Sequence, residues 1–309
     1  MIYKFKILYL IILFLSCGLT SVKSDENKIL FKINNDIITT VDLINEIKYL
    51  KIFNKELNNV EQEKLYEISK KSIIREKLKK IELSKYFEKL EIERKYLENI
   101  ISNFYQNNNF ENLESFENFL LEKNLSIKFV EKKITIESIW NQFIFQKYKN
   151  DVKIKKDEIK ADVIKNNIQN EYLLSEIIFN LKTNESVEEK FKIIKSDIDN
   201  KNFETAALLH SISGSADKGG KVGWIKENSL NPKIKSSISK IKKYFYTDPI
   251  VVPGGFVILY INDKRTINIT DNIENEVELI VKAKTREQLN QFSNIYLNKI
   301  KKNIVINAL

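Results

Sequence analysis

Two stretches, GGKVGWIKENSLNPK (Gly219–Lys233) and VVPGGFVILY (Val251–Tyr260), hold five of the seven glycines and two of the three prolines of the chain. Apart from Gly18, every glycine lies between Gly214 and Gly255, and all three prolines lie in the same region. Glycine adopts positive φ and allows close backbone approach, while proline fixes φ and favours turns. We therefore interpret this region as part of a compact module that differs in structure from the rest of the chain.

The module, residues 171–265, is predicted to be a small α+β domain built around one sheet. Pro253-Gly254 suits the centre of a type II turn, because proline fixes φ at the first central position and glycine accepts the positive φ of the second. The last two strands are therefore expected to form a hairpin. Apolar runs and turn signals predict the order strand, helix, helix, strand, helix and hairpin, at residues 173–179, 186–200, 203–209, 219–225, 231–240, 250–252 and 256–261.

The residues before the module, 25–165, are predicted to form a helical body. A hairpin comes first, because ILFKI and DIIT flank Asn34-Asn35, a favourable pair for a tight turn. Thr39 and Asp42 resemble a capping box, which marks the start of a helix. Apolar residues at helical spacing predict further helices at residues 61–87, 90–105, 115–123 and 126–148.

The residues after the module, 266–309, are predicted to complete this body. Thr285 and Gln288 form a cap signal for a helix, and Leu289, Phe292 and Tyr296 form its helical stripe. A short strand candidate follows at residues 304–306, and a lone strand needs a partner. Because the N-terminal hairpin lacks a third strand, we predict that the two ends of the chain pair. The fold class is thus α+β: a mostly helical body formed by both chain ends, with one inserted α/β module.

The first 24 residues are predicted to be a secretory signal peptide. Lys4 and Lys6 give a positive start, residues 7–15 are apolar, and small residues follow up to Ser24. The apolar run is shorter than the roughly 20 residues that span a bilayer, and a short membrane anchor is the alternative. A second alternative is a lipoprotein cleaved before Cys17, because Leu-Ser-Cys resembles the end of a lipobox. We expect no later membrane-spanning segment.

Cysteine content and charge exclude several classes of site. Cys17 is the only cysteine, so cleavage after Ser24 would leave no disulfide and no cysteine metal site. The formal net charge is +9, and loss of the signal peptide, with its three lysines, would lower it to about +6. A basic chain can bind nucleic acid, but here the charges are mixed in sign and the protein is expected to be exported. We therefore predict no nucleic-acid partner, no metal and no other cofactor.

Element order and glycine spacing give the module a recognisable pattern. It is carried by LLSEIIF, FETAALLHSIS, GGKVGW, the helix start Leu230-Asn231-Pro232 and VVPGGFVILYINDKR. In these features the module resembles the parvulin (PpiC-type) family of peptidyl-prolyl isomerases. The flanking stretches KINNDIITTVDLINEI and FLLEKNLSIKFVEKKI, together with the closing helix and strand, resemble the SurA family of periplasmic chaperones. This second resemblance covers nearly the whole chain after the signal peptide and implies a periplasmic location.

The parvulin resemblance implies a site in which two hydrogen-bonded histidines and a nearby Cys or Asp surround a prolyl ring. The first histidine position falls on Glu176, the second on Val257, and the Cys or Asp position on Ser213. Val257 cannot replace a hydrogen-bonding imidazole. His210, the only histidine of the chain, matches neither position and is interpreted as a surface or packing residue. Glu176 is interpreted as a strand residue that faces solvent, and we predict no catalytic residue at these positions.

The apolar floor of the family's prolyl pocket falls on Val222, Leu230 and Ile234. These are the candidate peptide-binding residues, and ordinary core packing is the alternative role for them. GGKVGW is not a phosphate loop, because it lacks the Gly-Lys-Ser/Thr ending and a following helix.

The two resemblances and the replaced positions together predict an ATP-independent chaperone. Its expected partners are unfolded outer-membrane proteins or other exported proteins, bound in an apolar groove of the helical body. The alternative function is an active peptidyl-prolyl cis–trans isomerase that assists the folding of exported proteins. A structural or adhesin-like protein is a third class. The sequence predicts no particular oligomeric state.

Overall fold

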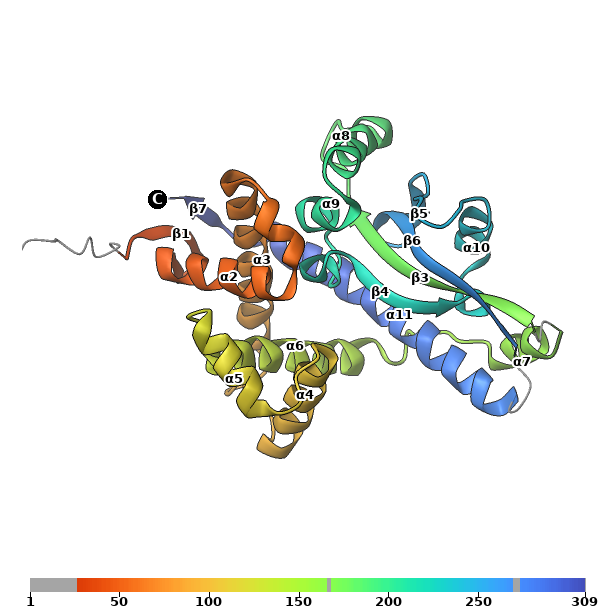
Figure 1. Ribbon diagram of the computed structural model, residues 1–309, viewed down its shortest axis with the longest axis horizontal. Coiled ribbons are helices and arrows are strands. Elements are labelled where there is room, and N and C mark those ends of the chain that lie inside the picture. The colour runs from red at the N-terminus through yellow and green to blue at the C-terminus, as the bar shows by residue number, and fades with distance from the viewer. Residues whose placement is uncertain (1–26, 166–167, 269–272, 309) are drawn as a thin grey trace, which may run out of the picture.

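The computed structural model describes residues 27–165, 168–268 and 273–308, so the predicted signal peptide and Cys17 lie outside the described residues. The body begins with β1 (Ile29–Ile33), β2 (Asp36–Thr39), α2 (Thr40–Phe53), η1 (Lys55–Asn59), α3 (Gln62–Leu83), α4 (Arg94–Asn107), α5 (Leu113–Glu122), α6 (Ile127–Tyr148) and α7 (Lys156–Lys165). The module follows with β3 (Ile168–Phe179), α8 (Val187–Asn200), α9 (Phe203–His210), η2 (Ala216–Lys218), β4 (Lys221–Lys226), η3 (Glu227–Ser229), α10 (Pro232–Ile238), β5 (Ile250–Val252) and β6 (Gly255–Asn268). The chain returns to the body with α11 (Ile273–Lys302) and β7 (Ile306–Ala308), and Figure 1 shows α11 running along both parts.

The two ends of the described chain meet in a three-stranded sheet of order β2-β1-β7. Strands β1 and β7 are antiparallel, with Phe31 opposite Ala308 and Ile33 opposite Ile306. The prediction that the two ends pair is therefore confirmed, although the last strand begins two residues later than expected. Asn34 has a φ of 51°, which supplies the left-handed backbone that the predicted hairpin turn requires.

Local signals set the helices of the body, and one apolar core joins them. The capping box predicted at the start of α2 is present, with the Thr39 N–H donating to the Asp42 carboxylate at 2.9 Å. The apolar face predicted on α6 is buried, and Trp140 at its centre has no exposed surface. Residues from both chain ends join Trp140 in a single cluster, which includes Phe31, Ile33, Leu297 and Ile300. The core itself therefore depends on both ends of the chain.

The module contains a four-stranded sheet of order β4-β3-β6-β5. The antiparallel pair β3 and β6 runs from Ile168 opposite Asn268 to Phe179 opposite Phe256, so both strands extend three residues beyond the predicted module boundaries. An ion pair of 2.5 Å between Glu171 and Arg265 joins the two strands where this extension begins and stabilises their pairing. The predicted two-residue turn after β5 is confirmed, with Gly254 at a φ of 88°.

Helix α11 begins at Ile273, so the prediction of a helix start near Thr285 is wrong. Before Thr285, acidic residues lie between apolar ones, and this order obscures the apolar stripe of a helix in the sequence. Val277 and Ile280 lie on that stripe and pack with Ile159 and Val163 of α7. The contact with α7 therefore stabilises the first turns of α11, which the local sequence does not predict.

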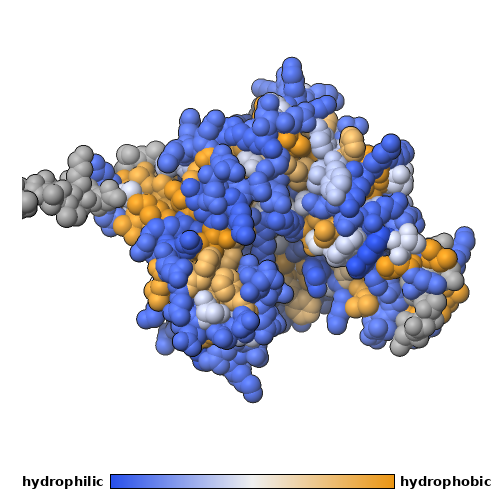
Figure 2. All heavy atoms as spheres, viewed as in Figure 1, coloured by the Kyte–Doolittle hydropathy of each residue, from blue (hydrophilic) through white to orange (hydrophobic). Residues whose placement is uncertain are grey.

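The face of the molecule seen in Figure 2 is mostly hydrophilic, and hydrophobic side chains gather on it over β1 and α2. Exposed side chains in that part of the body include Ile29, Ile37 and Val41. Among the described residues, no helix combines the length and the apolar character that crossing a membrane requires.

Candidate functional site

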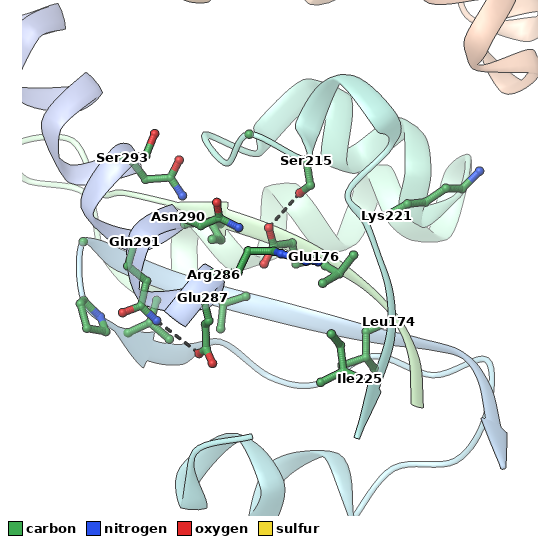
Figure 3. A pocket seen from close by; sticks show the side chains of 18 of the residues that line it. Leu174, Glu176, Ser215, Lys221, Ile225, Arg286, Glu287, Asn290, Gln291 and Ser293 are labelled. Carbon is green, nitrogen blue, oxygen red and sulfur yellow. Dashed lines mark hydrogen bonds between the residues drawn. The ribbon is translucent and has the colours of Figure 1, made fainter. Parts of the chain in front are cut away.

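A cavity of about 360 Å³ lies between the sheet of the module and helix α11. The module supplies residues from β3, β4, α10 and the β5–β6 hairpin, and the body adds side chains from α3 and α6. Figure 3 shows side chains from α11 pointing toward β3 and β4 across this space. The cavity is therefore shared by the two parts of the chain, whereas the predicted prolyl pocket was expected within the module.

The three predicted floor residues lie together in this cavity. Val222 is 43% exposed, Leu230 is half-buried, and Ile234 is 7% exposed and packs in the module core. Ile234 thus lines the cavity, as predicted, and also packs in the module core, which was the alternative role. Leu174 and Ile225 extend the apolar surface (Figure 3). Such a surface can accept an apolar side chain of a bound molecule.

Glu176 does not face open solvent, so that interpretation is wrong. Its side chain points into the cavity from β3, on the same face of the strand as Leu174 and Ile178 (Figure 3). The Ser215 hydroxyl donates a hydrogen bond of 2.8 Å to the Glu176 carboxylate. Burial raises the pKa of Glu176, and hydrogen bonds from Ser215 and Ser213 oppose this shift. The Glu176 carboxylate, at the predicted position of the first family histidine, is thus held by hydroxyl groups.

A chain of serine hydroxyl groups leads from the interior of the module to Glu176. The Oγ atoms of Ser211 and Ser213 are 3.0 Å apart, and those of Ser213 and Ser215 are 2.6 Å apart. Ser213 is buried and does not line the cavity, but its hydroxyl group also acts on Glu176 from behind the cavity wall. The sequence analysis missed Ser211 and Ser215, although their alternation with Ser213 in SISGS was a visible signal.

Val257 closes the cavity with an apolar side chain. It lies on β6 between Ile178 and Ile250 and is 3% exposed. Its aliphatic side chain lies at the predicted position of the second family histidine and cannot form a hydrogen bond.

His210 lies elsewhere, on α9 where the module meets the body. Its Nε2 atom is 2.8 Å from Asp197 Oδ2, and Lys64 of α3 contacts the same carboxyl group at 3.1 Å. Burial lowers the pKa of His210, while the hydrogen bond with Asp197 opposes this shift. His210 therefore packs at a contact between the module and the body and does not line the cavity.

The wall opposite the sheet consists of polar side chains of α11. Arg286 and Asn290 point from α11 toward Glu176 (Figure 3). Gln291 donates a hydrogen bond of 3.3 Å to Glu287 within the same wall. The remaining polar residues of the wall are Ser293 and Asn294 of α11 and Asn141 of α6. The sequence analysis did not predict this wall.

Contacts at both ends of α11 fix this wall. At the body end, the Trp140 ring N–H donates to Ser293 Oγ at 2.8 Å. At the module end, Lys284 donates to the Ser229 carbonyl oxygen at 2.8 Å. Among the described residues, no cluster of His, Cys, Asp and Glu has an arrangement that could hold a metal ion. The cavity thus has an apolar floor and a polar wall, which together can contact a molecule that carries both kinds of group.

Comparison with known proteins identifies the module. Residues 173–263 match the PPIC-type PPIASE (rotamase) domain family. The chain is 28% identical over 95 residues to the chaperone SurA of Idiomarina loihiensis, a match that covers 30% of this chain and 22% of that protein. It is 36% identical over 63 residues to the chaperone SurA of Pseudomonas putida, covering 20% of this chain and 15% of that protein. The matches thus span less than a quarter of the length of these relatives.

A solved structure of a SurA-like chaperone from Campylobacter jejuni is also similar, with 17% identity and a TM-score of 0.37, over 92% of this chain and 99% of that one. The prediction of a PpiC-type parvulin module in a SurA-like chain is confirmed by the family match and the curated relatives.

Proposed function

We propose that this SurA-like chain with its PpiC-type module is a periplasmic, ATP-independent chaperone for unfolded outer-membrane proteins. We further propose that the module has no isomerase activity. The curated relatives that match the chain are chaperones, which supports the first part. The signal peptide predicted from residues 1–24 supports a periplasmic location.

The observation that carries the second part is the composition of the cavity. Rotation about a peptide bond faces a barrier of about 18–20 kcal/mol. At the predicted positions of the two family histidines, the cavity presents a carboxylate on Glu176 and an aliphatic side chain on Val257. The carboxylate is already engaged by Ser215, and the only histidine of the chain is engaged by Asp197. Neither the hydrogen-bond pattern nor the polarity of a histidine pair is reproduced.

The remaining features favour reversible binding of apolar segments. An apolar side chain that enters the floor gains about 25 cal/mol for each Å² of apolar surface removed from water. Val222 is the most exposed of the three floor residues and offers the first contact. A single such site gives modest affinity, which suits a chaperone that must release its client.

An aggregation assay tests this function. An unfolded outer-membrane β-barrel protein is diluted from urea in the presence of the full chain, and light scattering is recorded. We expect suppression of aggregation at a few molar equivalents without ATP. Unchanged scattering at that ratio would overturn the proposal that the chain is a chaperone.

The intact apolar floor favours one alternative, an active isomerase. Val222, Leu230 and Ile234 line the cavity together, and a prolyl ring would pack against them. A protease-coupled assay with a proline-containing peptide separates the two functions. We expect relaxation at the uncatalysed rate, which takes tens of seconds or longer at 25 °C. A rate that increases with the concentration of the chain would show that the module is an enzyme.

A further inference from the structure

The polar face of α11 across the cavity has no role in the function described so far. We propose that Asn290 and Asn294 of this face bind the backbone of an extended client peptide while the module floor holds one of its apolar side chains. The peptide site would then be a composite of module and body. This inference rests on the proposed chaperone function and specifies how the client is recognised.

Free hydrogen-bonding groups on this face are the first support. Asn290 and Asn141 are exposed, Asn294 is half-buried, and all three line the cavity. Within the described part of the chain, their side chains have no hydrogen-bond partner, whereas the neighbouring Ser293 is occupied by Trp140. A side-chain amide carries two donors and an acceptor with two lone pairs. These amides are therefore available to a bound molecule.

Their spacing is the second support. Asn290 and Asn294 are four residues apart on α11 and so lie on one stripe, about 6 Å apart along the helix axis at 1.5 Å per residue. An extended peptide repeats its orientation every two residues, or about 6.6 Å at 3.3 Å per residue. Successive backbone groups on one side of such a peptide would thus meet successive amides. The helix spacing and the peptide repeat differ by less than about 1 Å per step, and flexible asparagine side chains can adjust by that distance.

The chemistry of the opposite walls identifies the occupant as a polypeptide. A backbone presents N–H and C=O groups in alternation, and an amide can satisfy either of them. This recognition does not depend on the client's sequence, which suits a chaperone with many clients. The module floor at Val222, Leu230 and Ile234 then adds a preference for an apolar side chain next to the bound backbone.

Charge on the cavity wall is mixed in sign. The carboxylates of Glu176 and Glu287 line the cavity together with cations that include Lys218 and Arg286. This mixture does not identify a polyanion as the occupant, and the free amides and the apolar floor favour a neutral, extended backbone.

Binding of two matched peptides to the full chain tests the proposal. The first is a fluorescein-labelled, twelve-residue peptide of serine and alanine with one central leucine. The second has the same sequence but carries N-methyl groups on alternate residues, which remove backbone donors and leave the side chains unchanged. The variant Asn290→Ala/Asn294→Ala is compared with wild type, and Asn298→Ala, on α11 but outside the cavity, is the matched control. Circular dichroism verifies that all three proteins are folded.

We expect the double substitution to weaken binding of the unmodified peptide about tenfold, since each hydrogen bond contributes modestly. N-methylation should weaken binding to wild type and to Asn298→Ala, and should have little further effect on the double variant. Equal affinity of wild type and the double variant, or an equal effect of N-methylation on both, would overturn the inference while leaving the chaperone function intact. If neither the peptide nor an unfolded barrel protein binds wild type, the proposed function itself fails.

Discussion

Gly254 approaches Ile295 so closely that a Cβ atom on Gly254 would lie 2.8 Å from Ile295 Cγ1. Gly254 is in the turn between β5 and β6 of the module, and Ile295 is on α11 of the body. Both Gly254 and the neighbouring Pro253 line the cavity. One close contact therefore sets how near the module hairpin comes to the wall that faces its sheet.

Replacement of Gly254 by alanine should destabilise the protein by about 1–3 kcal/mol, because the positive φ strains any side chain and the added methyl group meets Ile295. Urea unfolding measures this change. Gly223→Ala is the matched control, since its φ of 102° gives strain without a contact inside 4 Å. The second substitution Ile295→Ala should recover part of the loss in Gly254→Ala and none in Gly223→Ala. The absence of such recovery would show that the contact does not limit the approach of α11.

Lys133 is predicted to be the most sensitive charged residue of the body. Its Nζ atom lies 2.7 Å from carboxylate oxygens of both Glu46 and Glu76, and Glu46 is only 1% exposed. Lys133→Met would leave two carboxylates without their cation and should cost about 3–5 kcal/mol of unfolding free energy. The exposed pair of Lys155 and Glu158 provides the control, because a surface ion pair is screened by water and Lys155→Met should leave the unfolding free energy nearly unchanged. Similar losses for the two variants would contradict the prediction.

His210 should make the protein less stable in mild acid. Burial lowers the pKa of His210 below its ordinary value of 6.5, despite the opposing bond to Asp197. As the pH falls below about 6.5, the unfolded chain therefore takes up a proton more readily than the folded chain, and the unfolding free energy decreases. In His210→Gln this contribution is absent, while the amide can keep a hydrogen bond to Asp197.

Urea midpoints at pH 7.5 and pH 5.5 measure this effect. When the pH is lowered from 7.5 to 5.5, the unfolding free energy of wild type should decrease more than that of His210→Gln. Burial raises the pKa of Glu46 and of Glu176, which acts in the opposite direction, but both groups are present in both proteins and cancel in the comparison. An equal loss in the two proteins would show that His210 does not titrate differently in the folded chain.

The apolar floor is tested by Val222→Asp. Val222 is exposed, so the folded state should tolerate the change, whereas a client side chain would meet a charge instead of an apolar surface. Binding of an unfolded barrel protein should weaken about tenfold, as expected for the loss of one buried valine contact. Val251→Asp on β5 is the control, since Val251 is 59% exposed and lies outside the cavity. If Val251→Asp weakens binding as much as Val222→Asp does, the client does not contact the apolar floor at Val222.

The parts of the fold that follow from local chemistry could be predicted from the sequence. The turn at Asn34, the capping box of Thr39 and the turn at Gly254 each depend on a few neighbouring residues. The pairing of β1 with β7 followed from a simple requirement, because a short strand is unstable without a partner. The stripe of Leu289 and Tyr296 on α11 also packs on the body core as expected.

The polar wall of the cavity could not be predicted, because it forms only where α11 crosses the sheet. Glu176 lies on the face of β3 that would be open to solvent if α11 were absent, which is why strand alternation placed it outside. Asn290 lies on the side of α11 away from the core-facing stripe, so the helical pattern marks it only as exposed. Its position opposite Glu176 depends on the angle between helix and sheet, and tertiary contacts such as that of Trp140 with Ser293 set this angle.

The pairing of Phe31 with Ala308 also has a consequence for the order of folding. A chain that emerges from its N-terminus presents β1 long before β7, and closure of so long a loop is slow. The sheet of the module pairs strands from a much shorter span and can form earlier. We therefore expect a nascent chain to complete its module first, and to acquire both the finished body and the composite cavity only after its last strand has emerged.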